Sequence, residues 1–150
     1  MTQSHTASFS EKSFSDKLID GLFGGLLAGI AMALAMMFAA LVFGEDAVSI
    51  LGRFSTSQLT TPLNGLIGHL AVSGTYGAIY GSLLGVLPGA LRRLIPGWLA
   101  GLVYAALLLG LALGFVLPGL RSPLAEVPRV VLASGHLVYG LILGWRVSTR

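Results

Sequence analysis

The sequence predicts an all-α integral membrane protein folded as a four-helix bundle, and three observations support this fold class. Apolar residues make up 55% of the chain and charged residues only 10%, with a mean hydropathy of +0.86, whereas about a quarter of the residues in soluble domains are charged. Four segments are long enough to cross the roughly 30 Å hydrocarbon core of a bilayer, which takes about 20 helical residues. All 6 prolines fall at or beyond the ends of these segments, where they do not interrupt a helical hydrogen-bond ladder.

The chain is expected to consist of a disordered polar tail over residues 1–16 and one membrane domain over residues 17–150. Serine dominates the tail, which has too few apolar residues to form a core. The first apolar run is about 25 residues long, which exceeds the 7 to 15 apolar residues of a signal peptide, so we interpret it as a membrane anchor. The predicted membrane spans are residues 19–43, 63–87, 98–117 and 130–147.

The distribution of lysine and arginine predicts that both termini face the cytoplasm. One side of the membrane collects Lys12, Lys17, Arg92, Arg93, Arg146 and Arg150, and the other collects Arg53, Arg121 and Arg129 together with three acidic residues. Cytoplasmic loops carry the excess of basic residues in multi-pass proteins. No basic cluster exceeds the Arg92–Arg93 pair, so the predicted partner is membrane lipid, and nucleic acid is not expected.

Small residues recur at every fourth position in the predicted spans and indicate close helix packing. This spacing places them on one helix face, where backbones approach closely and gain contacts that lipid does not replace. The predicted packing positions are Gly21, Gly25, Gly29, Gly77, Gly81, Gly85, Gly140 and Gly144. These faces are expected to hold the bundle together, or to pack against a second copy of the chain or a larger membrane complex.

The two halves of the membrane domain resemble each other in sequence. Residues 26–29 match residues 98–101, and residues 68–70 match residues 135–137, with offsets of 72 and 67 positions. Both halves run in the same direction through the membrane, so the match predicts a parallel 2+2 internal repeat with a pseudo-two-fold axis along the membrane normal.

His69 and His136 are the candidate functional residues, because an ionisable side chain inside a bilayer is costly and usually serves a function. Each lies about two turns inside the same predicted boundary, so the two imidazoles are expected at one depth and facing each other. They could ligate the iron of haem b, hold a metal ion that the sequence does not identify, or share a proton with Tyr76, Tyr80 or Tyr139. The simpler alternative is an interhelical hydrogen bond without chemistry. We favour structural or proton-sharing histidines over ligands and expect no cofactor, because no carboxylate lies inside a span to complete a metal site or a proton relay.

Three classes of function remain open. The leading prediction is a structural or accessory membrane subunit that packs through its small-residue faces. The alternatives are a bis-histidine haem-binding or metal-binding membrane protein and a small oligomeric transporter or channel, although coupled transporters usually place an acidic or basic group deep in the membrane. An enzyme is not expected, since the chain has no cysteine and no phosphate-binding loop, dinucleotide fingerprint or nucleophile elbow.

The order of sequence motifs resembles that of a known group of proteins. A glycine-rich first span is followed by a Gly-His second span ending in Tyr-Gly-x-Leu-Leu, by Pro-Gly-Trp-Leu-Ala-Gly at residues 96–101 and by Gly-His-Leu-Val-Tyr-Gly at residues 135–140. This order resembles small uncharacterised bacterial membrane proteins, including the YagU-like inner-membrane family, over most of residues 20–145, with shorter external loops in this chain. The resemblance implies a four-helix fold in a bacterial inner (cytoplasmic) membrane and no established activity.

Overall fold

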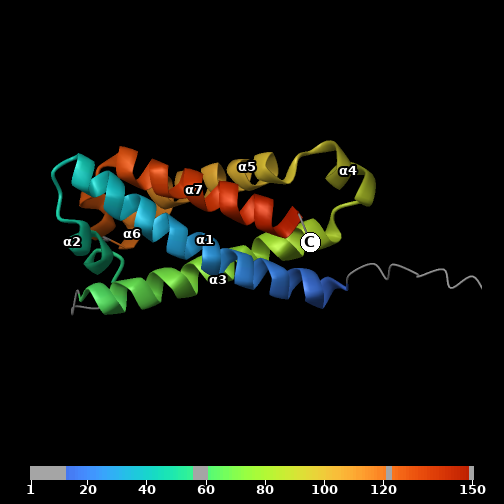
Figure 1. The fold of residues 1–150 in the computed structure, drawn as a ribbon, viewed down its shortest axis with the longest axis horizontal. Coiled ribbons are helices and arrows are strands. Elements are labelled where there is room, and N and C mark those ends of the chain that lie inside the picture. The colour runs from blue at the N-terminus through green and yellow to red at the C-terminus, as the bar shows by residue number, and fades with distance from the viewer. Residues whose placement is uncertain (1–12, 56–60, 121–122, 149–150) are drawn as a thin grey trace, which may run out of the picture.

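The computed structural model describes residues 13–55, 61–120 and 123–148. Over these residues every element of regular secondary structure is helical, which confirms the predicted all-α class. The long helices α1 (Phe14–Val42), α3 (Pro62–Val86), α5 (Gly97–Leu111) and α7 (Arg129–Ser148) run lengthwise through the molecule (Figure 1). The shorter elements are α2 (Ala47–Gly52), α4 (Gly89–Leu94), the π-helix η1 (Ala112–Val116), α6 (Leu117–Leu120) and the 3-10 helix η2 (Pro123–Glu126).

Three helical segments are long and apolar enough to cross a membrane, and they indicate a membrane protein. They are Phe14–Val42, Gly97–Gly119 and Arg129–Ser148. The predicted second span, α3, is 25 residues long. It is not among the three, because its glycines, serines and tyrosines, together with His69, make it less apolar.

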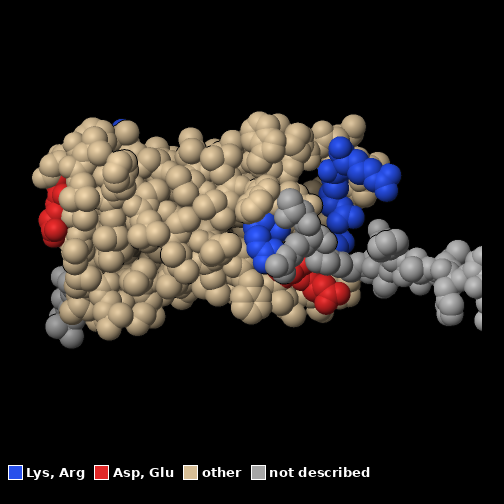
Figure 2. Space-filling view, viewed as in Figure 1, with Lys and Arg blue, Asp and Glu red and all other residues tan. Residues whose placement is uncertain are grey.

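Charged side chains gather at the two ends of the molecule. The start of α1, helix α4 and the end of α7 lie at one end, called here the α4 end, and α2 and α6 lie at the other, called the α2 end (Figure 1). On the face seen in Figure 2, basic side chains collect at the α4 end, and the broad band between the two ends is free of charge. Large apolar side chains are exposed along the long helices, with Phe38 70% exposed and Leu107 67% exposed. This arrangement is the one expected for a surface that faces lipid.

Both ends of α1 are determined by local interactions. Ser13 caps the helix by accepting a 3.2 Å hydrogen bond from the backbone N–H of Asp16, whose carboxylate accepts a 3.0 Å bond from the Ser13 N–H. This capping box starts the helix at Phe14, so the prediction of a tail extending to residue 16 is wrong for residues 14–16, and residues 1–12 lie outside the described part. At the other end Gly44 has a φ of +76°, a conformation that glycine adopts without strain and that ends the helix.

Helices α1 and α3 cross at a glycine contact that leaves no room for side chains. A Cβ atom added at Gly77 would lie 2.5 Å from Cα of Gly25, and one added at Gly21 would lie 2.9 Å from Cα of Gly81. These neighbours are backbone atoms, so they cannot move aside as a flexible side chain could. Gly85, which was predicted to pack on the same face, differs because its added Cβ would meet only side-chain atoms, 3.3 Å away on Phe14.

Helices α5 and α7 cross through a matching set of contacts. An added Cβ at Gly101 would lie 2.7 Å from Cα of Gly144, and one at Gly140 would lie 2.7 Å from Cβ of Ala105. The partners correspond position by position to those of the first crossing. Gly97 and Gly101 follow Gly21 and Gly25 by 76 residues, and Gly144 and Ser148 follow Gly77 and Gly81 by 67 residues. The first offset is one helical turn longer than the 72 residues that the sequence match suggested.

The α1–α3 pair and the α5–α7 pair meet through α1 and α7. The contact is made of larger side chains than the glycine crossings, with Leu143 and Val147 against Gly24, and Met36 against Gly135. Met36 and Leu143 are both fully buried. Helix α2 covers the α2 end of the α1–α3 pair, where fully buried Ile50 anchors it.

The last part of the third predicted span departs from a regular α-helix. Helix α5 continues into the π-helix η1, in which the N–H of Leu117 bonds to the carbonyl oxygen of Ala112, and then into α6, which contains Pro118. The prediction that every proline lies at or beyond a helix end is therefore wrong for Pro118. A proline crowds the carbonyl of the fourth residue before it in an α-helix, and the wider π-turn just ahead of Pro118 relieves this crowding.

Candidate functional site

The two candidate histidines line one cavity of about 230 Å³ between α1, α3, α7 and the α5–η1–α6 run, called here the histidine cavity. Its polar lining residues are His69, Ser73, Tyr76, His136 and Tyr139, and its remaining wall is apolar. None of the described residues that line it is charged. The cavity therefore suits an uncharged molecule with an apolar body and a small polar group.

His69 connects α3 to α1. Its side chain is 6% exposed, and its Nε2 lies 2.9 Å from the carbonyl oxygen of Gly29. A carbonyl oxygen only accepts hydrogen bonds, so Nε2 carries the proton and Nδ1 keeps its lone pair. The ring of Phe54, which follows α2, packs on the imidazole with 4.4 Å between ring centroids. Both contacts hold His69 in a single orientation.

His136 makes its hydrogen bond within its own helix. Its Nδ1 lies 2.8 Å from the carbonyl oxygen of Leu132, one turn earlier in α7. By the same argument Nδ1 carries the proton, and Nε2 is left with a lone pair that no described residue satisfies. The structure thus brings the two predicted histidines to one cavity. Within the described residues it gives them no hydrogen bond to each other or to a tyrosine.

Tyrosine hydroxyls connect α3 to the α5–α7 pair. Tyr139 donates a 2.8 Å hydrogen bond to the carbonyl oxygen of Ser73, and Tyr104 donates a 2.8 Å bond to the carbonyl oxygen of Tyr76. Tyr80 donates a longer 3.4 Å bond to the carbonyl oxygen of Gly97 and packs on Tyr104, with ring centroids 5.1 Å apart.

These bonds form a set of contacts between the two helix pairs, called here the tyrosine layer, to which Tyr80, Tyr104 and Tyr139 contribute hydroxyls and Tyr76 its backbone carbonyl. Tyr76 and Tyr139 line the histidine cavity on one side of this layer, and Tyr80 lines a second cavity on the other side, toward the α4 end. Residues of the tyrosine layer therefore line both cavities.

The π-helix forms part of the cavity wall. Ala112 and Val116, its first and last residues, both line the histidine cavity, as does Leu117 immediately after it. Single π-turns within α-helices occur frequently at functional sites, because they turn side chains out of the regular helical register. This observation is independent of the histidines and points to the same cavity.

Sequence reasoning missed two features of this site. Phe54, which follows α2, covers the His69 ring, and Ser73 contributes its backbone carbonyl as the acceptor of the Tyr139 hydroxyl. Ser134, close to His136 in the chain, donates its hydroxyl to the carbonyl of Val131 in its own helix. No spacing pattern in the sequence marks either feature, since each depends on how helices meet.

The described residues contain no cluster of three or more histidine, cysteine or acidic residues that could hold a metal ion. Comparisons with protein-family models, with curated proteins and with solved structures each found no match to this chain. The resemblance to the YagU-like family therefore stays a prediction from motif order.

Proposed function

We propose that this chain is a four-span membrane protein that binds a small, neutral, hydroxyl-bearing molecule in the histidine cavity. The observation that carries the proposal is that two imidazoles line one uncharged cavity while each donates its single N–H to a backbone carbonyl. Each ring is then left with one lone pair, so the histidines act as hydrogen-bond acceptors toward a ligand.

The cavity favours a ligand that donates a hydrogen bond. Tyr139 already uses its hydroxyl proton on Ser73, so it too presents acceptor capacity to the cavity. An apolar cavity of about 150 Å³ is enough to hold benzene, so 230 Å³ accommodates a single substituted ring. Phenols and hydroquinones combine such a ring with a hydroxyl that stays neutral near pH 7, because a phenol has a pKa of about 10.

The proposed membrane arrangement makes α3 the fourth span. Helix α3 has no charged residue over its 25 positions, and it packs lengthwise against α1, which is apolar enough to cross by itself. Its less apolar face is turned to α1 and to the tyrosine layer, where neighbouring helices replace lipid. We propose a four-helix bundle with a parallel 2+2 repeat, supported by the matching glycine contacts, in a bacterial inner membrane with the basic α4 end on the cytoplasmic side.

Binding of a simple probe tests the function. The full-length protein in lipid nanodiscs is titrated with 4-fluorophenol and with 4-fluoroanisole, which has a methyl group in place of the hydroxyl proton, and ¹⁹F NMR reports the bound fraction. We expect the phenol to bind at least about ten-fold more tightly, because the anisole leaves the imidazole acceptor unpaired. His136→Leu should abolish the difference, and Thr75→Val, which removes an exposed hydroxyl elsewhere on α3, should preserve it. Equal binding of the two probes by the unaltered protein contradicts the proposal.

Haem b is the second candidate ligand, and the geometry of His136 favours it. A histidine whose Nδ1–H donates to a backbone carbonyl presents Nε2 to a metal in a fixed direction. His69 is oriented less well for this role, because its Nε2 is already bonded to Gly29. A visible spectrum of the purified protein with and without dithionite decides between the ligands. A Soret band that shifts on reduction and disappears in His136→Ala would replace the phenol proposal with a haem protein.

The two remaining predicted functions have less support than ligand binding. The glycine faces that suggested an accessory subunit are used inside the chain, between α1 and α3 and between α5 and α7, so they do not require a partner. A transporter or channel would need a path through the tyrosine layer, where hydroxyls bonded to backbone carbonyls join the helix pairs. Both remain predictions for this chain, and an enzyme activity is not proposed.

A further inference from the structure

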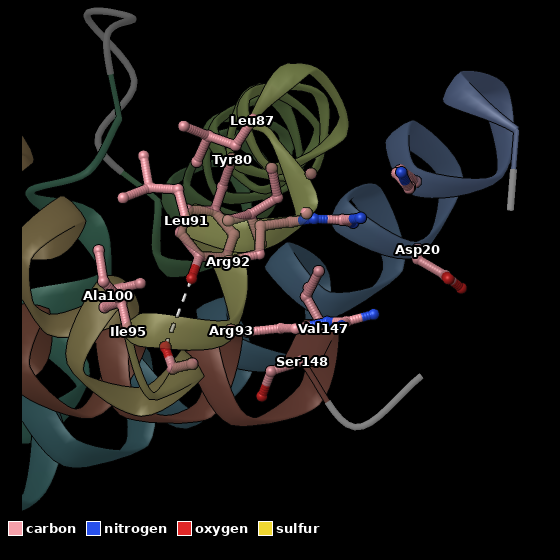
Figure 3. A pocket seen from close by; sticks show the side chains of 15 residues that line it. Asp20, Tyr80, Leu87, Leu91, Arg92, Arg93, Ile95, Ala100, Val147 and Ser148 are labelled. Carbon is pink, nitrogen blue, oxygen red and sulfur yellow. Dashed lines mark hydrogen bonds between the residues drawn. The ribbon is translucent and has the colours of Figure 1, made fainter. Parts of the chain in front are cut away.

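A second cavity, distinct from the histidine cavity, lies at the α4 end of the molecule. Its volume is about 400 Å³, and α1, α3, α4, α5 and α7 all contribute to its lining. Three of the lining residues are basic, Lys17, Arg92 and Arg93, and one is acidic, Asp20. Figure 3 shows Arg92 and Arg93 reaching from α4 in one direction, toward α1, which carries Asp20. The described lining therefore has an excess of positive charge.

Arg92 differs from a basic residue that simply lies at a membrane surface. Its Nε atom is buried and has no hydrogen-bond partner among the described residues. A buried N–H group without a partner is unfavourable, and a bound molecule or ion is one of the explanations that such a group in a native protein calls for. The guanidinium is therefore available to an acceptor that enters the cavity.

Apart from the charged residues, Tyr80 and Ser148, the lining is apolar, and it favours a ligand with an apolar part over a small inorganic anion. Leu84, Leu87, Leu91, Ile95 and Val147 form the wall beside the basic residues. Leu94 on the same helix, α4, is 77% exposed. A ligand that matches both parts has an anionic group attached to a hydrocarbon body.

We propose that this cavity binds the headgroup of an anionic phospholipid, with its phosphodiester on Arg92 and Arg93 and the first part of its acyl chains against the leucines. Arginine presents a fork of N–H donors that suits phosphate oxygens, and basic pockets between membrane helices are known places for anionic headgroups. Trp98, half exposed in the first turn of α5, directly follows Gly97 of the cavity lining, and tryptophan is enriched at the membrane interface. The site is independent of the ligand proposed for the histidine cavity.

Tryptophan quenching by brominated lipids tests the site in the full-length protein. Brominated phosphatidylglycerol and brominated phosphatidylcholine are compared, and the two tryptophans, which are both exposed, report the lipid in contact. We expect phosphatidylglycerol to bind roughly ten-fold or more tightly, since each basic residue near a headgroup contributes about five-fold. Equal binding of the two lipids overturns the proposal.

Variants separate the cavity from the general charge of the α4 end. Arg92→Gln should lower the preference for phosphatidylglycerol about five-fold. Arg146→Gln removes the same charge from the last turn of α7, outside the cavity lining, and should leave the preference unchanged. Equal losses in both variants would mean that only surface charge matters and would overturn the site.

Arg92→Lys keeps the charge and should retain most of the preference, which shows that the loss in Arg92→Gln is not a folding defect. Loss of the preference in excess inorganic phosphate would assign the cavity to a free anion and overturn the lipid proposal.

Discussion

The hydroxyl of Tyr139 donates a 2.8 Å hydrogen bond to the backbone carbonyl of Ser73, which lies 66 residues earlier in the chain. This bond joins α7 to α3, two helices that do not pack closely along their lengths. Ser73 is also the position where α3 approaches Gly25 and Gly29 of α1. One residue of α3 is thus in contact with both neighbouring helices, beside the cavity that contains the histidines.

Removing this hydroxyl should weaken the contact between the two helix pairs. Tyr139→Phe is expected to lower the free energy of unfolding in the membrane by about 0.5–2 kcal/mol, the range for an interhelical hydrogen bond. Steric-trap unfolding in bicelles measures the change. Thr75→Val is the matched control, because the Thr75 hydroxyl bonds only to its own helix at Ala71. Equal effects of the two substitutions would show that the Tyr139 bond does not contribute specifically.

The glycine crossing should tolerate no added methyl group. Gly77→Ala is expected to lower the free energy of unfolding by about 1–3 kcal/mol, because the new Cβ would meet the backbone of Gly25 and the two helices must move apart. Gly110→Ala is the control, since a Cβ there meets nothing within 4 Å, and it should leave stability unchanged or slightly raised. A tolerated Gly77→Ala would argue against the close approach of α1 and α3.

Gly85 provides a further test on the same face of α3. Its added Cβ would touch only the side chains of Phe14 and Lys17, at 3.3 and 3.4 Å, and both side chains can shift. Gly85→Ala is therefore expected to change stability by less than about 0.5 kcal/mol. A loss as large as that of Gly77→Ala, measured in the same unfolding assay, would extend the tight crossing to the α4 end.

The two histidines should respond differently to substitution. His69→Leu removes the bond from α3 to Gly29 of α1 and is expected to lower stability by about 0.5–1.5 kcal/mol. His136→Leu removes a bond within one helix and should cost less stability while abolishing the selective binding of 4-fluorophenol. Unfolding and probe titration on both variants check the contrast. The reverse order of stability losses would show that His136, and not His69, bridges helices.

The crossing of α3 through the membrane can be tested with introduced cysteines, because the chain contains none. Gly89→Cys and Ser148→Cys place a thiol at the α4 end, and Asp46→Cys places one at the α2 end. In intact cells a membrane-impermeant maleimide should label only the Asp46→Cys variant, and all three should react once the membrane is permeabilised. Labelling of Gly89→Cys together with Asp46→Cys would place both ends of α3 on one side and contradict four spans.

Part of this fold is readable from composition and local pattern. The ends of α3 and α7 lie within one residue of the predicted spans, because Pro62 begins α3 and the apolar runs match the thickness of a bilayer. The start of α1 was misplaced because the local Ser13–Asp16 capping box extends the helix into a polar stretch. The irregular helix over residues 112–120 was not predicted, because no pattern in the composition marks a π-turn ahead of Pro118.

Hydropathy and residue spacing alone indicate a helical protein made for a membrane, place its glycines on helix faces, and identify His69 and His136 as the candidate functional residues. Those properties depend on hydropathy and on a four-residue spacing, which are local along the chain. The tertiary structure was needed to show that the glycine faces are used within the chain, that tyrosine hydroxyls join the two helix pairs, and that the histidines share a cavity with different hydrogen bonds. Each of these depends on the rotation and offset of one helix against another. Packing between distant segments sets that geometry, and local pattern does not encode it.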